Sequence, residues 1–339
     1  MAIKAVALLS GGLDSSLAIR LVQDQGVEVE GLHFVSVFNR TAPERSCLLT
    51  ALRVGRQLGV KVKTVNFTHE QLAIAQCPAH GYGSNMNPCI DCHMAMLRRA
   101  AEHMGRVGAR FIVSGEVVGQ RPMSQRGAVL RQVDRETGLG GLILRPLSAR
   151  LLPPTVPERE GWVDRERLLD IGGRSRKRQL ELARRYGITE HSSPAGGCLL
   201  TDPGFAARLR DLAEASPGGL DLGDVHLLKV GRHFRLDPTT KAIVGRNERE
   251  NATVHTFSRA DDLLMTTRDA PGPCALLRGR KAEGHVRTAA ALTARYSKLR
   301  AQPSVAIAVT AGRKGPDGQA RVVDVAPVTD AVAQGLRVE

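Results

Sequence analysis

Long apolar runs and aromatic side chains are both scarce in this chain of 339 residues. No apolar segment approaches the roughly 20 residues that cross a bilayer, and the first residues lack the pattern of a signal peptide. We therefore expect a soluble, cytoplasmic protein with no membrane partner. Aromatic residues make up 3% of the chain, which disfavours a stacking platform for single-stranded nucleic acid. Hydrophobic residues at 42% and charged residues at 24% exclude a chain that is disordered throughout.

Acidic residues are outnumbered by basic ones. The chain holds 48 Lys and Arg against 34 Asp and Glu, which gives a net charge of +14, and its pI is near 10.1. A field of this sign attracts polyanions, so the expected partner is a nucleic acid or a nucleotide. A general bias toward arginine codons would produce the same excess.

The length suits two domains, which we place at residues 1–215 and 220–339, on either side of a Ser-Pro-Gly-Gly linker at 216–219. In the first domain, short apolar runs alternate with segments of helical periodicity. The predicted strands are 3–9, 27–37, 60–67 and 109–114, and the predicted helices are 13–25, 46–58, 94–104, 176–186 and 206–215. This alternation predicts an α/β fold with a doubly wound parallel sheet, whose ligands bind at the carboxyl ends of the strands.

The second domain has a different pattern. Short strands are predicted at 225–229, 242–244 and 305–309, and a helix at 289–299. An α+β domain of about a hundred residues follows from this pattern.

A glycine-rich turn joins the first predicted strand to the first predicted helix. It is Ser10-Gly11-Gly12-Leu13-Asp14-Ser15-Ser16. Glycines let the backbone approach an anion closely, and the free amides at a helix start bind phosphate. The three serines add hydroxyl donors. The sequence contains no GxxxxGK[ST] segment, so this is not a Walker P-loop. An ordinary turn with a capping side chain is the structural alternative.

Six cysteines in a cytoplasmic chain favour metal binding or catalytic sulfur over a disulfide framework. Cys89 and Cys92 form a Cys-x-x-Cys pair, and Cys198 lies between Gly197 and Leu199. Three thiolates around a four-iron cluster would leave one iron open for chemistry. A zinc site that adds Cys77 with His80 or His93, and a dithiol that carries a persulfide, remain as alternatives. Cys47 and Cys274 are predicted to be small core residues.

The loop at residues 10–16 resembles the PP-loop of ATP pyrophosphatases, which are similar to the adenine-nucleotide alpha hydrolases. The segment 87–92, Asn-Pro-Cys-Ile-Asp-Cys, resembles that of bacterial tRNA 2-thiouridylases, and Cys198 matches their distal catalytic cysteine. Residues 195–203 resemble a thiouridylase-like subgroup with the same three cysteines, and the likeness extends to the 4-thiouridine synthases. The resemblance covers roughly residues 1–215.

This resemblance implies an ATP-dependent tRNA sulfurtransferase. The uridine carbonyl oxygen would attack the α-phosphate of ATP, and sulfide would then displace AMP. The implied cofactors are ATP, Mg²⁺ and a [4Fe-4S] cluster on Cys89, Cys92 and Cys198, with zinc as the alternative metal. Asp14 would order the loop or contact Mg²⁺. The partners would be tRNA and either sulfide or a sulfur-donor protein. The alternative function is a small-molecule amidating or nitrile-forming enzyme with structural zinc.

Other polar residues have predicted roles near these motifs. Gln120, Arg121 and Gln125 follow the fourth strand and are suited to bind the adenylate or the target base. Arg145 and the basic run 174–178 are predicted to contact the phosphate backbone of tRNA.

The C-terminal part, with glycine turns near 231, 245 and 272–279, resembles the RNA-binding domain of NFACT-type ribosome-quality-control proteins. Its predicted phosphate donors are Arg232, His233, Arg235, Arg246, Arg278, Arg280 and Lys281.

Overall fold

A computed structural model describes residues 2–40, 47–192, 197–313 and 320–339. The chain divides into two units, and the boundary lies between Thr201 and Asp202. The predicted boundary was later, at residue 215. Helix α8 (Pro203–Ala215) belongs to the second unit because Asp211 on this helix forms ion pairs with Arg235 and Lys241 of that unit. Within the described residues, every helix is too short or too polar to span a membrane.

The first unit is built on a five-stranded parallel sheet with the order β3-β2-β1-β4-β5, as the doubly wound prediction required. Its strands are β1 (Lys4–Leu8), β2 (Glu28–Val35), β3 (Lys61–Asn66), β4 (Phe111–Val113) and β5 (Ile143–Leu144). The helices of this unit are α1 (Leu13–Gln23), α2 (Cys47–Leu58), α3 (Thr68–Gln76), α4 (Cys89–Val107), α5 (Gly127–Glu136), α6 (Val156–Arg159) and α7 (Lys177–Arg185). The strand order reverses between β1 and β4, so their carboxyl ends form the switch point where ligands bind in such sheets.

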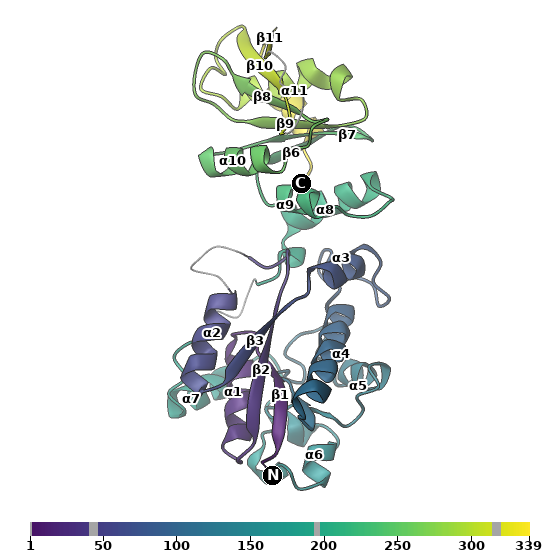
Figure 1. The fold of residues 1–339 in the computed structure, drawn as a ribbon, viewed down its shortest axis with the longest axis vertical. Coiled ribbons are helices and arrows are strands. Elements are labelled where there is room, and N and C mark those ends of the chain that lie inside the picture. Colours follow the sequence, from purple (N-terminus) through teal and green to yellow (C-terminus); the bar gives the residue numbers. More distant parts are fainter. Residues whose placement is uncertain (1, 41–46, 193–196, 314–319) are drawn as a thin grey trace. The chain divides into compact units, whose positions relative to one another are not determined.

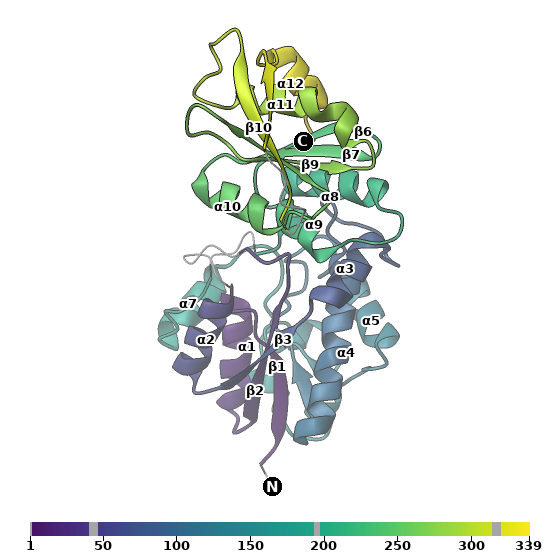
Figure 2. The same cartoon turned by 45° about the horizontal axis from the view of Figure 1, so that its top comes forward.

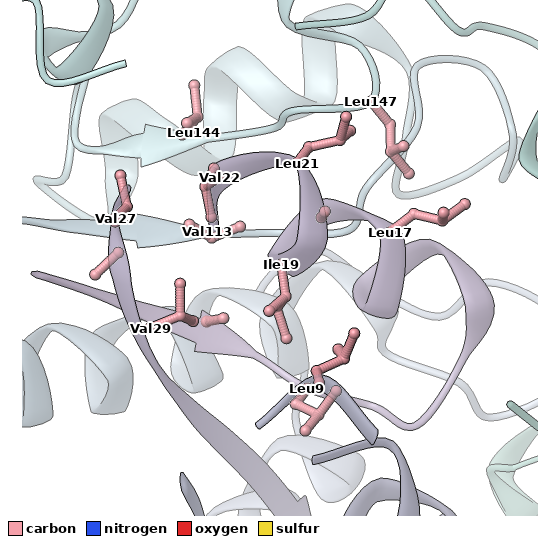
Figure 3. Packing of buried hydrophobic residues seen from close by; sticks show 14 of the residues in the cluster. Leu9, Leu17, Ile19, Leu21, Val22, Val27, Val29, Val113, Leu144 and Leu147 are labelled. Carbon is pink, nitrogen blue, oxygen red and sulfur yellow. The ribbon is translucent and has the colours of Figure 1, made fainter. Parts of the chain in front are cut away.

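Helices cover both faces of this sheet. Helices α1, α2 and α7 lie on one side of the strands in Figure 1, and α4 and α5 lie on the other. The side chains of β1 divide accordingly: Ala5 and Ala7 pack in one core cluster and Val6 in the other. Figure 3 shows the first cluster, in which Leu17 and Val113 take part. Burial on both faces explains why the central strands β1 and β4 are almost entirely apolar.

The second unit contains a six-stranded antiparallel sheet with the order β11-β10-β8-β9-β7-β6. Its strands are β6 (Arg232–Asp237), β7 (Thr240–Val244), β8 (Leu263–Thr267), β9 (Ala275–Gly279), β10 (Val305–Ala311) and β11 (Arg321–Val325). Its helices besides α8 are α9 (Leu222–Leu227), α10 (Glu248–Thr256), α11 (Val286–Arg295) and α12 (Asp330–Leu336), and Figure 2 shows α11 and α12 beside the strands. Helix α11 packs its alanines and Leu292 against one face of the sheet. This is the predicted α+β domain.

The strand predicted at residues 225–229 is wrong, because α9 occupies this segment. The Asp221 side chain caps this helix by accepting a hydrogen bond from the Asp224 amide at 3.2 Å. Val225 and Leu228, three residues apart, are both buried, which is the spacing of a helix face.

Candidate active site

The PP-loop connects β1 to α1 with a tight backbone turn. Gly11 has a φ of +79°, and a Cβ there would lie 2.9 Å from the Ala51 backbone nitrogen. Gly12 occupies the N-cap of α1, so the amides of the first helical turn have no partner within the helix. The sequence therefore places glycine where only glycine fits, and the helix start is suited to an anion.

The predicted serines have different positions in this loop. Ser10 is exposed, and its hydroxyl lies 3.1 Å from that of Ser15. The hydroxyls of Ser15 and Ser16 donate to the Gly12 carbonyl at 2.8 and 3.0 Å, and both side chains are buried. Ser15 and Ser16 thus hold the shape of the loop from inside.

The segment after β4 lies directly against the PP-loop. A Cβ on Gly115 would come within 2.5 Å of the Ser15 backbone nitrogen, so this contact requires glycine. A few residues later, the Gln120 amide donates to Asp14 Oδ2 at 3.0 Å. Gln120 is therefore placed at the loop, where the sequence predicted it.

A second segment, residues 172–176, joins this group. The Gly173 amide donates to the Val118 carbonyl at 2.7 Å, and Arg176 Nη2 lies 3.9 Å from Asp14 Oδ2. Among the described residues, no hydrogen-bond partner is found for three buried atoms here: Asp14 Oδ1, Gln120 Oε1 and Arg176 Nε. Buried polar atoms are normally satisfied, so three such atoms beside a phosphate loop indicate a polar ligand.

Arg176 was predicted to contact tRNA together with its neighbours in the basic run, but the structure places it beside Asp14. Arg174 and Lys177 are exposed, and Arg178 forms an ion pair with Asp170 at 2.8 Å. The run thus divides between the PP-loop and the surface. The signal that the sequence offered for Arg176, its position at the start of α7, was not recognised.

The Cys-x-x-Cys pair lies on the first turn of α4, which begins at Cys89, five residues earlier than predicted. The Cys92 side chain is buried, and its amide donates to the Pro88 carbonyl at 3.0 Å. The Asn87 side chain donates to Cys89 Sγ at 2.9 Å. A helix start therefore carries both thiols, with an amide donor on one sulfur.

Backbone contacts bring the Cys198 segment to the same place. The backbone of Cys198 forms an isolated antiparallel β-bridge with that of Asn39. The Met86 amide donates to the Leu200 carbonyl at 3.3 Å. The Asn85 side chain donates to the Thr201 carbonyl at 2.8 Å. Residues 193–196 of the predicted tight loop lie outside the described residues. The segment with Cys198 thus runs beside the residues that precede Cys89.

The three thiols influence one another. Burial raises the pKa of Cys92 to about 12, and the neighbouring Cys198 and Cys89 thiols contribute. Burial also raises the pKa of Cys89, although Arg121 and Asn87 oppose the shift. In the part of the chain that is described, no three His, Cys, Asp or Glu side chains are close enough to hold a metal ion as they stand. The cysteines are grouped but do not form a closed metal site.

The histidines of the alternative zinc site have other partners. His80 lies between Asp91, at 2.8 Å, and Glu136, at 3.0 Å. His93 Nε2 lies 3.0 Å from Glu116 Oε1. Cys77 is exposed. Cys274 is buried, as predicted, and the side chain of Cys47 lies outside the described residues.

A buried ionic network connects the β4 loop to the cysteine helix. Glu116 forms ion pairs with His93 and with Arg145, at 3.0 and 2.8 Å, and Arg145 also binds Asp134 through two hydrogen bonds. Burial alone would raise the pKa of Glu116, but His93 and Arg145 hold it below its ordinary value. The prediction that Arg145 contacts tRNA is wrong, because this side chain is buried. Sequence analysis missed Glu116, whose position three residues after the end of β4 was the available signal.

The predicted phosphate donors of the second unit also need correction. His233 is 1% exposed and bonds to the Val230 carbonyl, Arg235 pairs with Asp211, and Arg278 pairs with Asp262. The prediction is wrong for these three residues. His233 is buried, and Arg235 and Arg278 are partly buried and already paired with a carboxylate. Arg246, Arg280 and Lys281 are exposed, and Arg232 is partly exposed.

Comparison with known families agrees with both halves of this description. Residues 3–138 match the model of the tRNA methyl transferase HUP domain, and residues 231–334 match that of the NFACT protein RNA binding domain. The tRNA-specific 2-thiouridylase MnmA of Tolumonas auensis is 27% identical over 249 residues, which are 68% of this chain and 62% of that protein. MnmA of Escherichia coli is 34% identical over 147 residues, which are 39% of this chain and 38% of that protein.

Among solved structures, a 4-thiouridine synthetase in complex with RNA and bound ATP is 22% identical, with a TM-score of 0.38. The match covers 63% of this chain and 51% of that one. The chain spans about three fifths, or less, of the length of the curated relatives named above. The PP-loop and the three grouped cysteines thus lie in a chain that is similar to the tRNA-specific 2-thiouridylases, and its residues 231–334 are similar to the NFACT RNA-binding domain.

Proposed function

We propose that this protein is an ATP-dependent tRNA uridine thiolase. One observation carries the proposal: a continuous series of contacts joins the PP-loop to the cysteines. Ser15 of the loop touches Gly115, the next residue Glu116 pairs with His93, and His93 adjoins Cys92. An enzyme that activates a base with ATP and then delivers sulfur to it needs its ATP-binding site and its sulfur-carrying site close together.

ATP is the substrate of the first half of the reaction. The amides at the start of α1 and the exposed Ser10 bind its phosphates, and Arg176 adds positive charge beside Asp14. Mg²⁺ neutralises the phosphates, and the unpartnered oxygen of Asp14 is its candidate ligand. The uridine carbonyl oxygen attacks the α-phosphorus, the bond to the bridging oxygen breaks, and pyrophosphate leaves with that electron pair.

Cys89, Cys92 and Cys198 are the residues that would hold a [4Fe-4S] cluster. They fit such a group because three soft thiol ligands from two segments gather in a partly buried place, and the Asn87 amide already donates to one sulfur. When bound with three thiolate ligands, the cluster supplies an open iron that accepts sulfide. Zinc is the weaker candidate, since His80 and His93 are engaged by carboxylates.

The second half of the reaction replaces the activated oxygen. Sulfur forms a bond to the uridine carbon, and the carbon–oxygen bond breaks so that AMP leaves with its electron pair. Gln120, Arg121 and Gln125 lie in the segment after β4 and are proposed to orient the adenylate and the base. The sulfur comes from sulfide or from a donor protein. No described feature favours the small-molecule alternative.

Labelled ATP tests this proposal. With unmodified tRNA, we expect AMP and pyrophosphate as products, formed in step with sulfur incorporation into the RNA. The departing pyrophosphate carries the charge that the PP-loop stabilises. ADP as the main product, or AMP release at the full rate without tRNA, would refute the mechanism.

A further inference from the structure

A tight turn, residues 83–87, directly precedes the cysteine helix α4. Two backbone hydrogen bonds close it: the Gly83 amide donates to the Asn87 carbonyl at 2.8 Å, and the Asn87 amide donates to the Ser84 carbonyl at 3.3 Å. Asn85 in this turn has a φ of +60°, and in the part of the chain that the structure describes it is the one non-glycine residue with a positive φ. A left-handed residue other than glycine is uncommon, and such residues are concentrated at functional sites. We call residues 83–87 the asparagine turn.

The asparagine turn binds the segment that carries Cys198. Asn85 Nδ2 donates to the Thr201 carbonyl at 2.8 Å, and the Met86 amide donates to the Leu200 carbonyl at 3.3 Å. The Thr201 hydroxyl in turn donates to the Cys198 carbonyl at 2.7 Å. Met86 and Leu200 are both buried. The turn therefore fixes the two carbonyls that follow shortly after Cys198 in the chain.

The end of the same turn contacts the other cysteine segment. Asn87 Nδ2 donates to Cys89 Sγ at 2.9 Å, and α4 begins at Cys89. The middle of the turn is thus bound to the Cys198 segment and its end to the Cys89 sulfur. Because the turn is closed by its own hydrogen bonds, its geometry sets how far apart these two segments lie.

The residues after β2 hold the Cys198 segment from another direction. The Leu199 amide donates to the Phe38 carbonyl at 2.8 Å, and the Arg40 amide donates to the Gly197 carbonyl at 3.2 Å. Phe38 is fully buried, so this pairing attaches the segment to the core beside the sheet. The asparagine turn supplies a connection to α4 that this pairing does not.

We propose that Asn85 is a positioning residue that keeps Cys198 within reach of Cys89 and Cys92 for the transfer of sulfur. The inference rests on the proposed function and adds to it how the two cysteine segments are held together. Asparagine suits this position because it tolerates a left-handed backbone and its amide can donate to the Thr201 carbonyl. Alanine loses the donor and disfavours this backbone, whereas glycine loses only the donor. The two substitutions therefore separate the backbone from the hydrogen bond.

The first test measures the proximity of the thiols in the reduced, metal-free full chain. Dibromobimane joins two thiols that lie close together, and mass spectrometry of tryptic peptides identifies the joined cysteines. The yield of the link between Cys198 and the peptide with Cys89 and Cys92 should fall several-fold in Asn85→Ala, and less in Asn85→Gly. Ser84→Ala is the matched control and should give the wild-type yield, since Ser84 is exposed and takes part in the turn through its backbone carbonyl.

The second test separates the two halves of the reaction. Asn85→Ala should lower sulfur incorporation into tRNA several-fold more than it lowers tRNA-dependent pyrophosphate release, because only the sulfur step uses Cys198. A merely structural role would lower both rates together. Asn85 is exposed, so the urea midpoint of unfolding should stay near that of the wild type.

A wild-type cross-link yield in Asn85→Ala would overturn the proposal, and so would the same loss of yield in Ser84→Ala. Equal losses of pyrophosphate release and sulfur incorporation would also overturn it, since Asn85 would then act on the fold as a whole. The cross-linking requires no ATP, RNA or iron, so its result stands even if the thiolase reaction itself is not found.

Discussion

The two units of this protein use their charged residues in opposite ways. In the second unit, two arginines that were predicted to bind phosphate pair with carboxylates instead, Arg278 with Asp262 and Arg235 with Asp211. In the first unit, Asp14 and Arg176 keep buried atoms without partners beside the PP-loop. An excess of basic residues therefore does not by itself locate a binding site, whereas a group of unsatisfied polar atoms beside a phosphate loop points to one.

The largest effect should come from the grouped cysteines of the first unit. Changing Cys89, Cys92 or Cys198 to Ala should abolish iron binding and sulfur incorporation, because each removes one of three proposed ligands. Iron content and the visible spectrum of anaerobically purified protein measure this. Cys274→Ala, in the core of the second unit, should retain both properties, and so should Cys47→Ala. Stoichiometric zinc without iron would contradict the prediction.

The next effect separates catalysis from RNA binding within the basic run. Arg176→Ala should lower tRNA-dependent pyrophosphate release by about a hundredfold, the size expected when a charge that stabilises the reacting phosphates is lost. Arg178→Ala is the control, since Arg178 belongs to the same basic run but pairs with Asp170 and not with Asp14. The affinity for tRNA should change little in Arg176→Ala. Equal loss of turnover in both variants would return Arg176 to the tRNA-binding surface.

Stability should depend on the buried network of the first unit. Glu116→Ala leaves Arg145 with one carboxylate fewer and should lower the free energy of unfolding by about 3 kcal/mol or more. Urea unfolding measures this change. Glu181→Ala, on the exposed face of α7, should be nearly neutral. A neutral Glu116→Ala would mean that the network contributes nothing to folding.

The smallest effect concerns a single carboxylate of the second unit. Burial alone would raise the pKa of Glu250, but hydrogen bonds from Arg246 and Gly231 hold it below its ordinary value of 4.5. The ionised Glu250 therefore stabilises the folded state at pH values above 4.5. This contribution is lost as the pH falls through the lowered pKa. Glu250→Gln should be less stable by on the order of 1 kcal/mol near pH 6.

The two proteins should converge in stability under strongly acidic conditions, where wild-type Glu250 is protonated. Chemical unfolding at a series of pH values measures the difference. A gap that stays constant from pH 6 to acid would show that the carboxylate charge is not responsible.

Local patterns were sufficient to predict much of the first unit. The apolar runs predicted four of its five strands, and the glycines at 11 and 12 predicted the turn at the first strand end, because these features depend on neighbouring residues. The short strand β5 and helices such as α3 and α5 were not predicted. In the second unit, the apolar run at 225–229 was consistent with a strand, and the cap at Asp221 made it a helix.

The sequence alone determined the strand-to-helix phosphate loop and the list of cysteines, since each motif is contiguous. The tertiary structure decided which distant residues meet them. It brought Arg176 to Asp14 and Cys198 beside the segment before Cys89, and it buried Arg145 against Glu116. The pairing of a charge depends on strand order and on loop contacts far along the chain, and no local pattern encodes that.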